Sequence, residues 1–231
     1  MYNHEFYLKI FREFEVDDTP ETFEPCNIGH INTTLMVRCD GQIKYVLQKI
    51  NTSIFKKPAE LIENILNVTD FIKKKVLAAG GDPTREVLRL IPTRDGTFYT
   101  TDADGCVWRM YYFIIGAKTF QTAETPELFY NSALAFGKFQ RMLSDFPADK
   151  LHETIPNFHN TVSRFADFKK ALADDVAGRA DSVREEVQFV LDHEGICSYI
   201  TDRIASGEYP LRVTHNDTKL NNVMIDEKTF K

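Results

Sequence analysis

Apolar residues follow two different periods along this chain, and the change between them divides the sequence. The first residues, 3–14, show helical spacing, which predicts a short amphipathic helix carried by Phe6, Ile10, Phe11 and Phe14. From residue 22 to residue 50 the apolar residues alternate over short runs. The Asp40-Gly41 pair separates runs at 34–38 and 43–47, which predicts a β-hairpin with a tight turn.

A long helical pattern follows this hairpin. Pro58 opens it and the Gly80-Gly81 pair ends it, which is the usual placement of proline and glycine around a helix. Three more apolar segments, 87–91, 97–101 and 107–115, are separated by turns rich in Asp and Gly and are predicted as strands. The pattern therefore predicts a five-stranded antiparallel sheet with a short leading helix and one long helix.

After Gly116 the pattern becomes helical. A stripe of apolar residues predicts one helix, and weaker amphipathic patterns predict helices at 161–173 and 181–205. The members of the stripe are Leu128, Phe129, Phe136, Phe139, Leu143 and Phe146. The sequence thus predicts an α+β protein with a β-rich amino-terminal lobe at 1–116 and a helical carboxyl-terminal lobe at 117–231.

Composition narrows the classes of partner. A net charge of −6 over 231 residues argues against a nucleic acid or an anionic membrane, because both usually meet a basic surface. No run of about twenty apolar residues is present, and the first residues do not resemble a secretion signal. The four cysteines are far apart, without a Cys-x-x-Cys pair. We expect a cytoplasmic protein with a small molecule or another protein as its partner.

The most informative motif lies near residue 220. His215 and Asp217 form a His-x-Asp sequence, and Asn222 follows the Asp by five residues. In kinase catalytic loops this spacing joins an Asp that accepts the proton of the attacking hydroxyl to an Asn that binds magnesium. We therefore expect Asp217 to be the catalytic base, Asn222 a magnesium ligand, and Lys219 a cation that contacts the transferred phosphoryl group.

The motif alone has a simpler interpretation, since His215, Asp217 and Asn222 could be ordinary polar residues of a loop. The order of the surrounding segments favours the kinase interpretation. The motif follows a β-rich lobe and a helical block and precedes a short strand predicted at 223–226, as a kinase-like two-lobed fold requires.

A loop over the nucleotide phosphates is expected between the first two strands. Its candidate residues combine one glycine, which permits close approach of the backbone, with hydrogen-bond donors: Gly29, His30, Asn32, Thr33 and Thr34. A simple hairpin turn is the alternative interpretation of this segment. Adenine is expected to meet the backbone between Tyr112 and Ile115, centred on Phe113.

The strand after this loop should present a basic side chain to the α and β phosphates. Gln48 occupies the expected position, and Lys49 should face the other side because side chains alternate along a strand. Two possibilities stay open: Gln48 acts as a neutral substitute, or a bulge brings Lys49 to the phosphates. A partner carboxylate on the following helix would be Glu60 or Glu63, although the alternative that both lie on a solvated face of that helix fits equally well.

Taken together, these segments resemble the aminoglycoside phosphotransferase and choline kinase superfamily, and within it the N-acetylhexosamine 1-kinase group, some members of which are labelled mucin desulfatases. The matching stretches are 29–32, 47–51, 108–110, 155–159 and 215–222. Asn216 stands where the superfamily usually has glycine. The resemblance implies ATP and Mg²⁺ as cofactors, and γ-phosphoryl transfer to the anomeric hydroxyl of an N-acetylated amino sugar. It also implies that Gln48 is the usual residue of this group.

The desulfatase label finds no support, because no cysteine or serine lies in the Cys/Ser-x-Pro-x-Arg context of a sulfatase nucleophile. Other acceptors, such as choline or an aminoglycoside, are the alternatives within the kinase class. A different class is a catalytically silent kinase-like binding protein. The second, acidic metal ligand is expected within about ten residues after Asp226, so the chain as written is predicted to be truncated at its carboxyl end and inactive alone.

Overall fold

The computed structural model describes residues 3–27, 29 and 31–230. Contacts between residues divide the chain into two units. The first comprises Met1–Thr154 and Val213–Lys231, and the second comprises Ile155–Arg212. These units do not correspond to the two predicted lobes, and the predicted lobe boundary between residues 116 and 117 stays a prediction.

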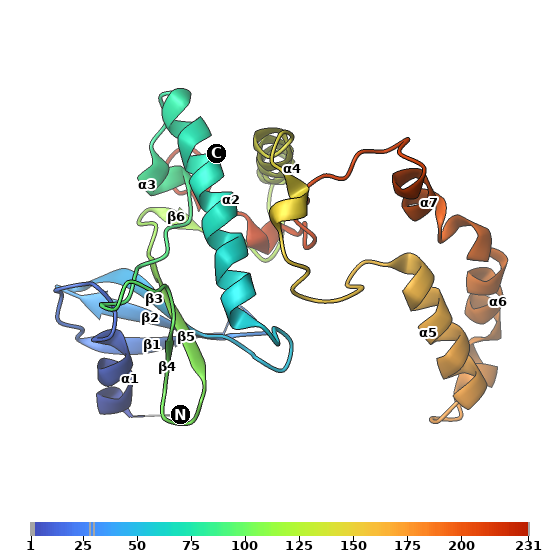
Figure 1. Cartoon of the computed structure of the whole chain (residues 1–231), viewed down its shortest axis with the longest axis horizontal. Coiled ribbons are helices and arrows are strands. Elements are labelled where there is room, and N and C mark those ends of the chain that lie inside the picture. Colours follow the sequence, from blue (N-terminus) through green and yellow to red (C-terminus); the bar gives the residue numbers. More distant parts are fainter. Residues whose placement is uncertain (1–2, 28, 30, 231) are drawn as a thin grey trace. The chain divides into compact units, whose positions relative to one another are not determined.

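A five-stranded antiparallel sheet forms the amino-terminal part of the first unit (Figure 1). The strand order is β1-β2-β3-β5-β4. The strands are β1 (Thr22–Cys26), β2 (Thr33–Cys39), β3 (Gln42–Lys49), β4 (Thr100–Thr101) and β5 (Val107–Tyr112). The predicted five-stranded sheet is thus confirmed, although its fifth member is β1 and not the strand predicted at 87–91.

The predicted hairpin is the pair β2 and β3. Asp40 and Gly41 form its turn, with φ values of 49° and 74°. A two-residue turn that matches the twist of antiparallel strands needs positive φ at both positions, which Asp tolerates and Gly adopts without strain. The two strands pair from Cys39 opposite Gln42 at the turn to Thr33 opposite Lys49 at the other end, and the register shifts once, between Val37 and Arg38.

The leading helix α1 (His4–Phe11) covers one face of this sheet. Asn3 caps the helix by accepting a hydrogen bond from the Phe6 amide, as expected for a polar residue at a helix start. Ile10 and Phe11 pack with alternate residues of three strands, including Leu35, Leu47 and Met110, in a buried cluster. These strand residues are opposite one another in the register and therefore share a face.

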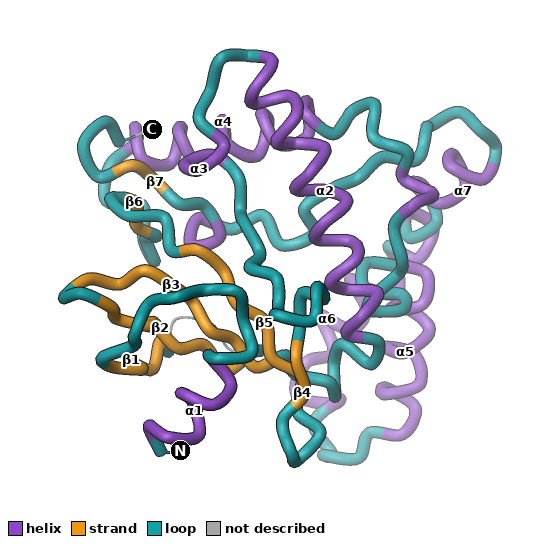
Figure 2. Tube along the Cα trace, turned by 60° about the vertical axis from the view of Figure 1, so that its left-hand side comes forward, coloured by secondary structure: helices purple, strands orange, loops and turns teal. Residues whose placement is uncertain are grey.

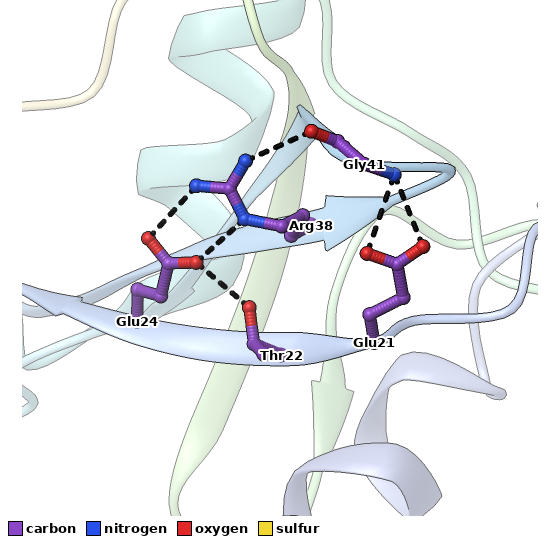
Figure 3. A network of polar contacts seen from close by, with 5 residues as sticks. All are labelled: Glu21, Thr22, Glu24, Arg38 and Gly41. Atoms are coloured by element: carbon purple, nitrogen blue, oxygen red, sulfur yellow. Dashed lines mark hydrogen bonds and ion pairs between the residues drawn. The ribbon is translucent and has the colours of Figure 1, made fainter.

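A polar network closes the β1 edge of the sheet (Figure 3). Arg38 of β2 donates to Glu24 of β1 and to the carbonyl of Gly41 in the hairpin turn. Glu21 accepts from the amide of the same glycine. These charged side chains connect the edge strand to the turn, and charge on an edge strand also opposes pairing with other chains.

The long helix α2 (Pro58–Ala78) follows the sheet and is confirmed close to its predicted ends. It packs in two directions along its length: Ile62 contacts Ile50 and Val107 of the sheet, whereas Ile72 and Val76 contact Leu143 and Phe146. The chain then makes the short helix α3 (Pro83–Glu86), which Asp82 caps, and later α4 (Pro126–Met142), which Thr125 caps. A 3₁₀ turn spans Ala148–Lys150.

The strand predicted at 87–91 is wrong. This segment lies beside β5, but it makes only one bridge, between Leu90 and Tyr111, with hydrogen bonds that flank it. Pro92 follows and cannot donate to a continued ladder, which limits the pairing. The predicted strand 97–101 shortens to β4 because Asp95 accepts from Thr93 and Thr97 and holds that segment in a turn.

The second unit is helical. Helix α5 (Thr161–Asp174) agrees with the prediction, but the single helix predicted at 181–205 is wrong. It is divided into α6 (Arg184–Asp192) and α7 (Tyr199–Ala205), with 3₁₀ turns over Ala180–Val183 and Glu194–Ile196. Gly195 lies at the break, and glycine is a poor helix former. In the first unit, the apolar stripe predicted from Leu128 to Phe146 needs two corrections: the Phe129 side chain is largely exposed, and α4 ends at Met142, so Leu143 and Phe146 are buried after the end of the helix.

No helix among residues 3–27, 29 and 31–230 is long and apolar enough to cross a membrane.

Candidate active site

The loop that carries His215, Asp217 and Asn222 belongs to the first unit, and a short strand and helix α4 hold its carboxyl end in place. It leads through a 3₁₀ turn at Leu220–Asn222 into the short strand β7 (Ile225–Asp226), where a strand was predicted. β7 pairs antiparallel with β6 (Ala117–Lys118), which follows β5 closely (Figure 2). Val223 and Ile225 pack on Leu128 of α4. The loop is therefore connected to the end of the large sheet and to α4.

The structure brings the three predicted residues of the loop together. The side-chain amide of Asn222 donates to both the carboxylate and the backbone carbonyl of Asp217, at 2.7 and 2.8 Å. The Lys219 ammonium lies 3.3 Å from the same carboxylate oxygen. All three side chains are exposed or partly exposed, so an acceptor and a nucleotide could reach them. Their catalytic and metal-binding roles stay proposals.

These contacts keep the Asp217 carboxyl ionised. The hydrogen bond from Asn222 is the largest cause, and it holds the pKa of Asp217 below its ordinary value together with Lys219. An ionised carboxylate at neutral pH can accept a hydrogen bond from an alcohol and orient its oxygen. The side chain is therefore prepared for that role before any ligand binds.

His215 stabilises the loop. Its ring lies between the rings of Phe136 and Phe139 of α4, with centroid distances of 5.5 and 5.9 Å. Its Nδ1 accepts from the amide of Asp217 at 3.3 Å. An acceptor at Nδ1 requires the proton to lie on the other ring nitrogen in the neutral form. These contacts agree with a structural role for His215 in orienting the Asp217 backbone.

The loop fits a magnesium site of the kind that nucleotides complete. Mg²⁺ prefers oxygen ligands and commonly takes one or two from the protein, the others coming from phosphate and water. Asn222 uses its amide nitrogen on Asp217, so its amide oxygen can serve as a ligand. Among the described residues no group of three or more His, Cys, Asp or Glu side chains could form a metal site built from protein alone.

The loop predicted to cover the phosphates is described at Gly29 and from residue 31 onward, whereas His30 lies outside the described residues. Asn32 accepts from the amide of Asn51 at 2.9 Å, which ties the loop to the segment after β3. Thr33 and Thr34 are the first residues of β2. A Cβ atom added at Gly29 would meet nothing within 4 Å, so open space surrounds this position.

Gln48, and not Lys49, shares a face of the sheet with Thr34. The two are opposite in the register, and the Gln48 amide donates to the Thr34 hydroxyl at 2.9 Å. The ladder on both sides of β3 is regular from Tyr45 to Lys49, so no bulge turns Lys49 to this face. The alternative in which a bulge exposes Lys49 is therefore wrong.

One residue of this face was not among the predicted site residues. Arg109 of β5 is opposite Gln48 and donates to its side-chain oxygen through Nε and Nη2, at 3.0 and 2.7 Å. The sequence contained a signal, because a charged residue within the apolar run of β5 conflicts with the pattern of a buried strand.

Neither predicted partner carboxylate on α2 contacts Gln48 in the structure. Glu60 pairs with Lys57 at the start of the helix, and the Glu63 carboxylate accepts from the His152 ring at 2.8 Å. The first contact lies within one helical turn, the second joins residues 89 apart, and both are partly solvent-exposed. They agree with the alternative that these residues form the solvated face of the helix.

The segment expected to meet adenine follows β5. The Phe113 amide donates to the Lys44 carbonyl at 2.8 Å, so an adenine contact at Phe113 would use its carbonyl. Arg85 of α3 donates to the Ile115 carbonyl and to the Asp226 carboxylate. Gly116 has a φ of 73°, which turns the chain into β6, and its carbonyl accepts from the Glu227 amide. The segment is thereby fixed to β7.

No protein-family model matches the chain. Two solved structures resemble it in fold. A kanamycin complex of the aminoglycoside phosphotransferase APH(2")-IIIa, with GDP bound, is 17% identical with a TM-score of 0.53, over 91% of this chain and 64% of that one. Amicoumacin kinase, bound to AMP-PNP, Ca²⁺ and amicoumacin, is 14% identical with a TM-score of 0.50, over 81% and 54%.

The chain therefore spans between about half and two thirds of the length of these structures. At such identities the likeness concerns the fold. The chain has the α+β, kinase-like fold of these phosphotransferases, with the five-stranded sheet as its amino-terminal lobe.

Proposed function

We propose that this chain belongs to an ATP-dependent kinase of small molecules, in which Asp217 is the catalytic base and Asn222 a magnesium ligand. The observation that supports this most is the contact between them: the Asn222 amide lies 2.7 Å from the Asp217 carboxylate, in a loop joined through β7 and β6 to the end of the large sheet. Phosphoryl transfer depends mainly on such positioning and on neutralisation of charge.

The reaction follows from these positions. The hydroxyl oxygen of the acceptor attacks the γ-phosphorus of ATP, the bond from that phosphorus to the β-phosphate oxygen breaks, and ADP leaves. Asp217 accepts the hydroxyl proton, and Lys219, 3.3 Å from it, offers positive charge to the phosphoryl oxygens. Bound magnesium would supply further charge neutralisation on the phosphates.

The amino-acid resemblance favours an N-acetylated amino sugar as the acceptor, phosphorylated at its anomeric hydroxyl. The stretches that support this choice include Gln48 on β3 and the loop at 215–222. The two structural neighbours bind small molecules, kanamycin in one and amicoumacin in the other. We propose ATP and Mg²⁺ as the cofactors and the cytoplasm as the site of action.

Release of ADP should be measured with N-acetylglucosamine, N-acetylgalactosamine, choline and kanamycin. The 231-residue chain and the full product of its gene are assayed side by side, and the activity is expected of the full product. We expect activity with the N-acetylated sugars and none with their 1-O-methyl glycosides, which lack a free anomeric hydroxyl. Activity with the methyl glycosides would contradict transfer to that hydroxyl.

Asp217→Asn should lower kcat by at least about a thousand-fold while nucleotide binding is retained, since the base is lost but the loop can still form. Asp202→Asn, at an exposed carboxylate of α7, is the matched control and should leave kcat unchanged. If the full gene product binds ATP and phosphorylates no acceptor, it is a kinase-like binding protein instead.

A further inference from the structure

Arg109 is a buried cation without an acidic partner. Its side chain belongs to a residue that is only 8% exposed, in the middle of β5. No ion pair joins it to a carboxylate in the described part of the chain, and its Nη1 atom is buried there without a hydrogen-bond partner. Burial lowers the pKa of Arg109, although a guanidinium stays protonated in proteins. The guanidinium also lies over the Tyr111 ring, 5.1 Å from its centroid, but a buried charge without an anion still costs free energy, so this arrangement calls for an explanation.

The position of Arg109 in the sheet supplies an explanation for its burial. Thr34, Gln48 and Arg109 are successive partners in the register of β2, β3 and β5, so their side chains form a row on one face of the sheet. Hydrogen bonds run along this row from the guanidinium to Gln48 and from Gln48 to Thr34. The face is the one opposite to α1, because Leu47 and Met110, the next residues along, pack on that helix.

The row begins at the loop expected to cover the phosphates. Thr34 is the last candidate residue of that loop, and Gln48 occupies the place where a cation was expected but offers only a neutral amide. The nearest charge on the same face is therefore the guanidinium bonded to Gln48. Arginine is suited to phosphate because its planar group donates several hydrogen bonds and remains charged.

We propose that Arg109 provides the positive charge that binds the nucleotide phosphates, with Gln48 holding its guanidinium in place. This inference rests on the proposed function, since it concerns the nucleotide of that same site. The phosphates would compensate the buried charge, which no carboxylate among the described residues does. Gln48 positions the guanidinium, and its own amide bonds Thr34 at the beginning of β2.

A structural role and a phosphate-binding role predict opposite effects on stability. If Arg109 served packing alone, replacing it should lower the melting temperature. If Arg109 serves to bind an anion, Arg109→Met, which retains much of the volume without the charge, should leave the melting temperature of the unliganded chain equal or higher. We expect an equal or higher melting temperature.

Binding of ATP, ADP and adenosine should be measured by calorimetry on the 231-residue chain and its variants. Adenosine lacks phosphates and reports on the adenine pocket alone. Arg109→Met should weaken ATP and ADP by about 10- to 100-fold, as expected for loss of charged hydrogen bonds, and change adenosine binding less than about two-fold. The double variant Arg109→Met with Gln48→Lys should restore most of the ATP affinity, because it returns a cation to the row.

The outcomes separate this inference from the proposed function. If the unchanged chain does not bind ATP, the proposed function fails. If it binds ATP and Arg109→Met binds ATP equally well, or loses ATP and adenosine in equal proportion, the role of Arg109 in phosphate binding is overturned while the proposed function stands. Failure of the double variant to regain affinity would also overturn it.

Discussion

Arg85 and Asp226 form an ion pair of 2.6 Å between Nη2 and Oδ2, although 141 residues separate them in the sequence. Through Nη1 the same guanidinium donates to the carbonyl of Ile115, in the segment expected to meet adenine. One side chain thus joins the proposed adenine segment to the strand that leaves the proposed catalytic loop.

We expect Arg85→Ala to weaken ATP binding by about three- to ten-fold and to lower the free energy of unfolding by about 1 kcal/mol. The loss of stability is modest because the pair is partly exposed and water screens it. The effect on binding should be larger than this exposure suggests, since the Ile115 carbonyl loses its donor. Calorimetry with ATP and urea denaturation measure the two effects.

Arg94→Ala is the matched control for this experiment. Arg94 also donates to two backbone carbonyls, those of Arg12 and Val16, but at the end of the sheet near α1. It should lower stability by a similar amount and leave ATP binding unchanged. Equal losses of ATP affinity in the two variants would contradict a specific role for Arg85.

Asn222→Ala should raise the pKa of Asp217 toward its ordinary value. The hydrogen bond from Asn222 is the main cause of the depressed pKa. The bond therefore stabilises the folded loop fully above the unfolded pKa of Asp217, and this stabilisation is lost as the pH falls through the lower, folded pKa. NMR titration of the Asp217 carboxyl carbon in both proteins measures the shift without requiring activity.

Asn221→Ala serves as the control for that titration, since the neighbouring amide donates to Gln121 and not to Asp217. The titration of Asp217 should be unchanged in this variant. The interpretation is contradicted if Asn221→Ala and Asn222→Ala move the midpoint equally, because the shift would then follow from general loosening of the loop.

His215→Ala should loosen the loop without unfolding the sheet. It removes two ring contacts, with Phe136 and Phe139, and the acceptor of the Asp217 amide. Aromatic pairs contribute about 1 kcal/mol each, so exchange of the Asp217 amide hydrogen should become roughly five-fold faster or more. His159→Ala, which removes a ring contact with Phe158 in the second unit, should leave that exchange rate unaltered.

Trp108→Phe should destabilise the first unit by about 2 kcal/mol at neutral pH, the usual contribution of a hydrogen bond to a charged group. The Trp108 indole donates to the buried Asp102 carboxylate at 2.8 Å. Burial raises the pKa of Asp102, but this bond and two backbone amides outweigh it, so the pKa is lowered overall.

The destabilisation in Trp108→Phe should depend on pH with a definite sign. Because the pKa of Asp102 is depressed in the folded state, the contribution of the bond is present above the unfolded pKa and is lost as the pH falls through the folded one. Urea denaturation at neutral and at strongly acidic pH should show a smaller difference between the two proteins at acidic pH. A difference independent of pH would indicate that only packing was lost.

Local signals predicted the elements whose causes are local. The turn at Asp40 and the helix that begins at Pro58 depend on nearby residues, and both were predicted close to their observed positions. Alternation along β3 predicted that Gln48 and Lys49 face opposite sides, and the regular register confirms it.

The errors arose where local pattern and tertiary pairing differ. Residues 87–91 have the composition of a strand, but Pro92 and a single neighbouring strand restrict them to one bridge. The helix predicted over 181–205 followed the apolar pattern and gave too little weight to Gly195, a poor helix former that lies where the chain divides into α6 and α7. The contact of Arg85 with Asp226 joins segments far apart in the sequence, and no periodicity in either segment contains that information.

The contacts among Asp217, Lys219 and Asn222, the proposed site residues of one loop, were predictable because their spacing alone brings them together. Arg109 was not predicted, although its charge within an apolar run was visible. Its proposed role depends on its register opposite Gln48, which only the sheet defines.

Trp108 is the only tryptophan of the chain, and it is fully buried between the sheet and α1. The intrinsic fluorescence of this protein therefore reports on a single place, one residue before Arg109 on β5. Unfolding of the sheet should shift the emission toward longer wavelengths, whereas unfolding of α5, α6 and α7 leaves the indole unaffected. An optical signal followed alongside circular dichroism would thus distinguish melting of the sheet of the first unit from melting of the helices of the second unit.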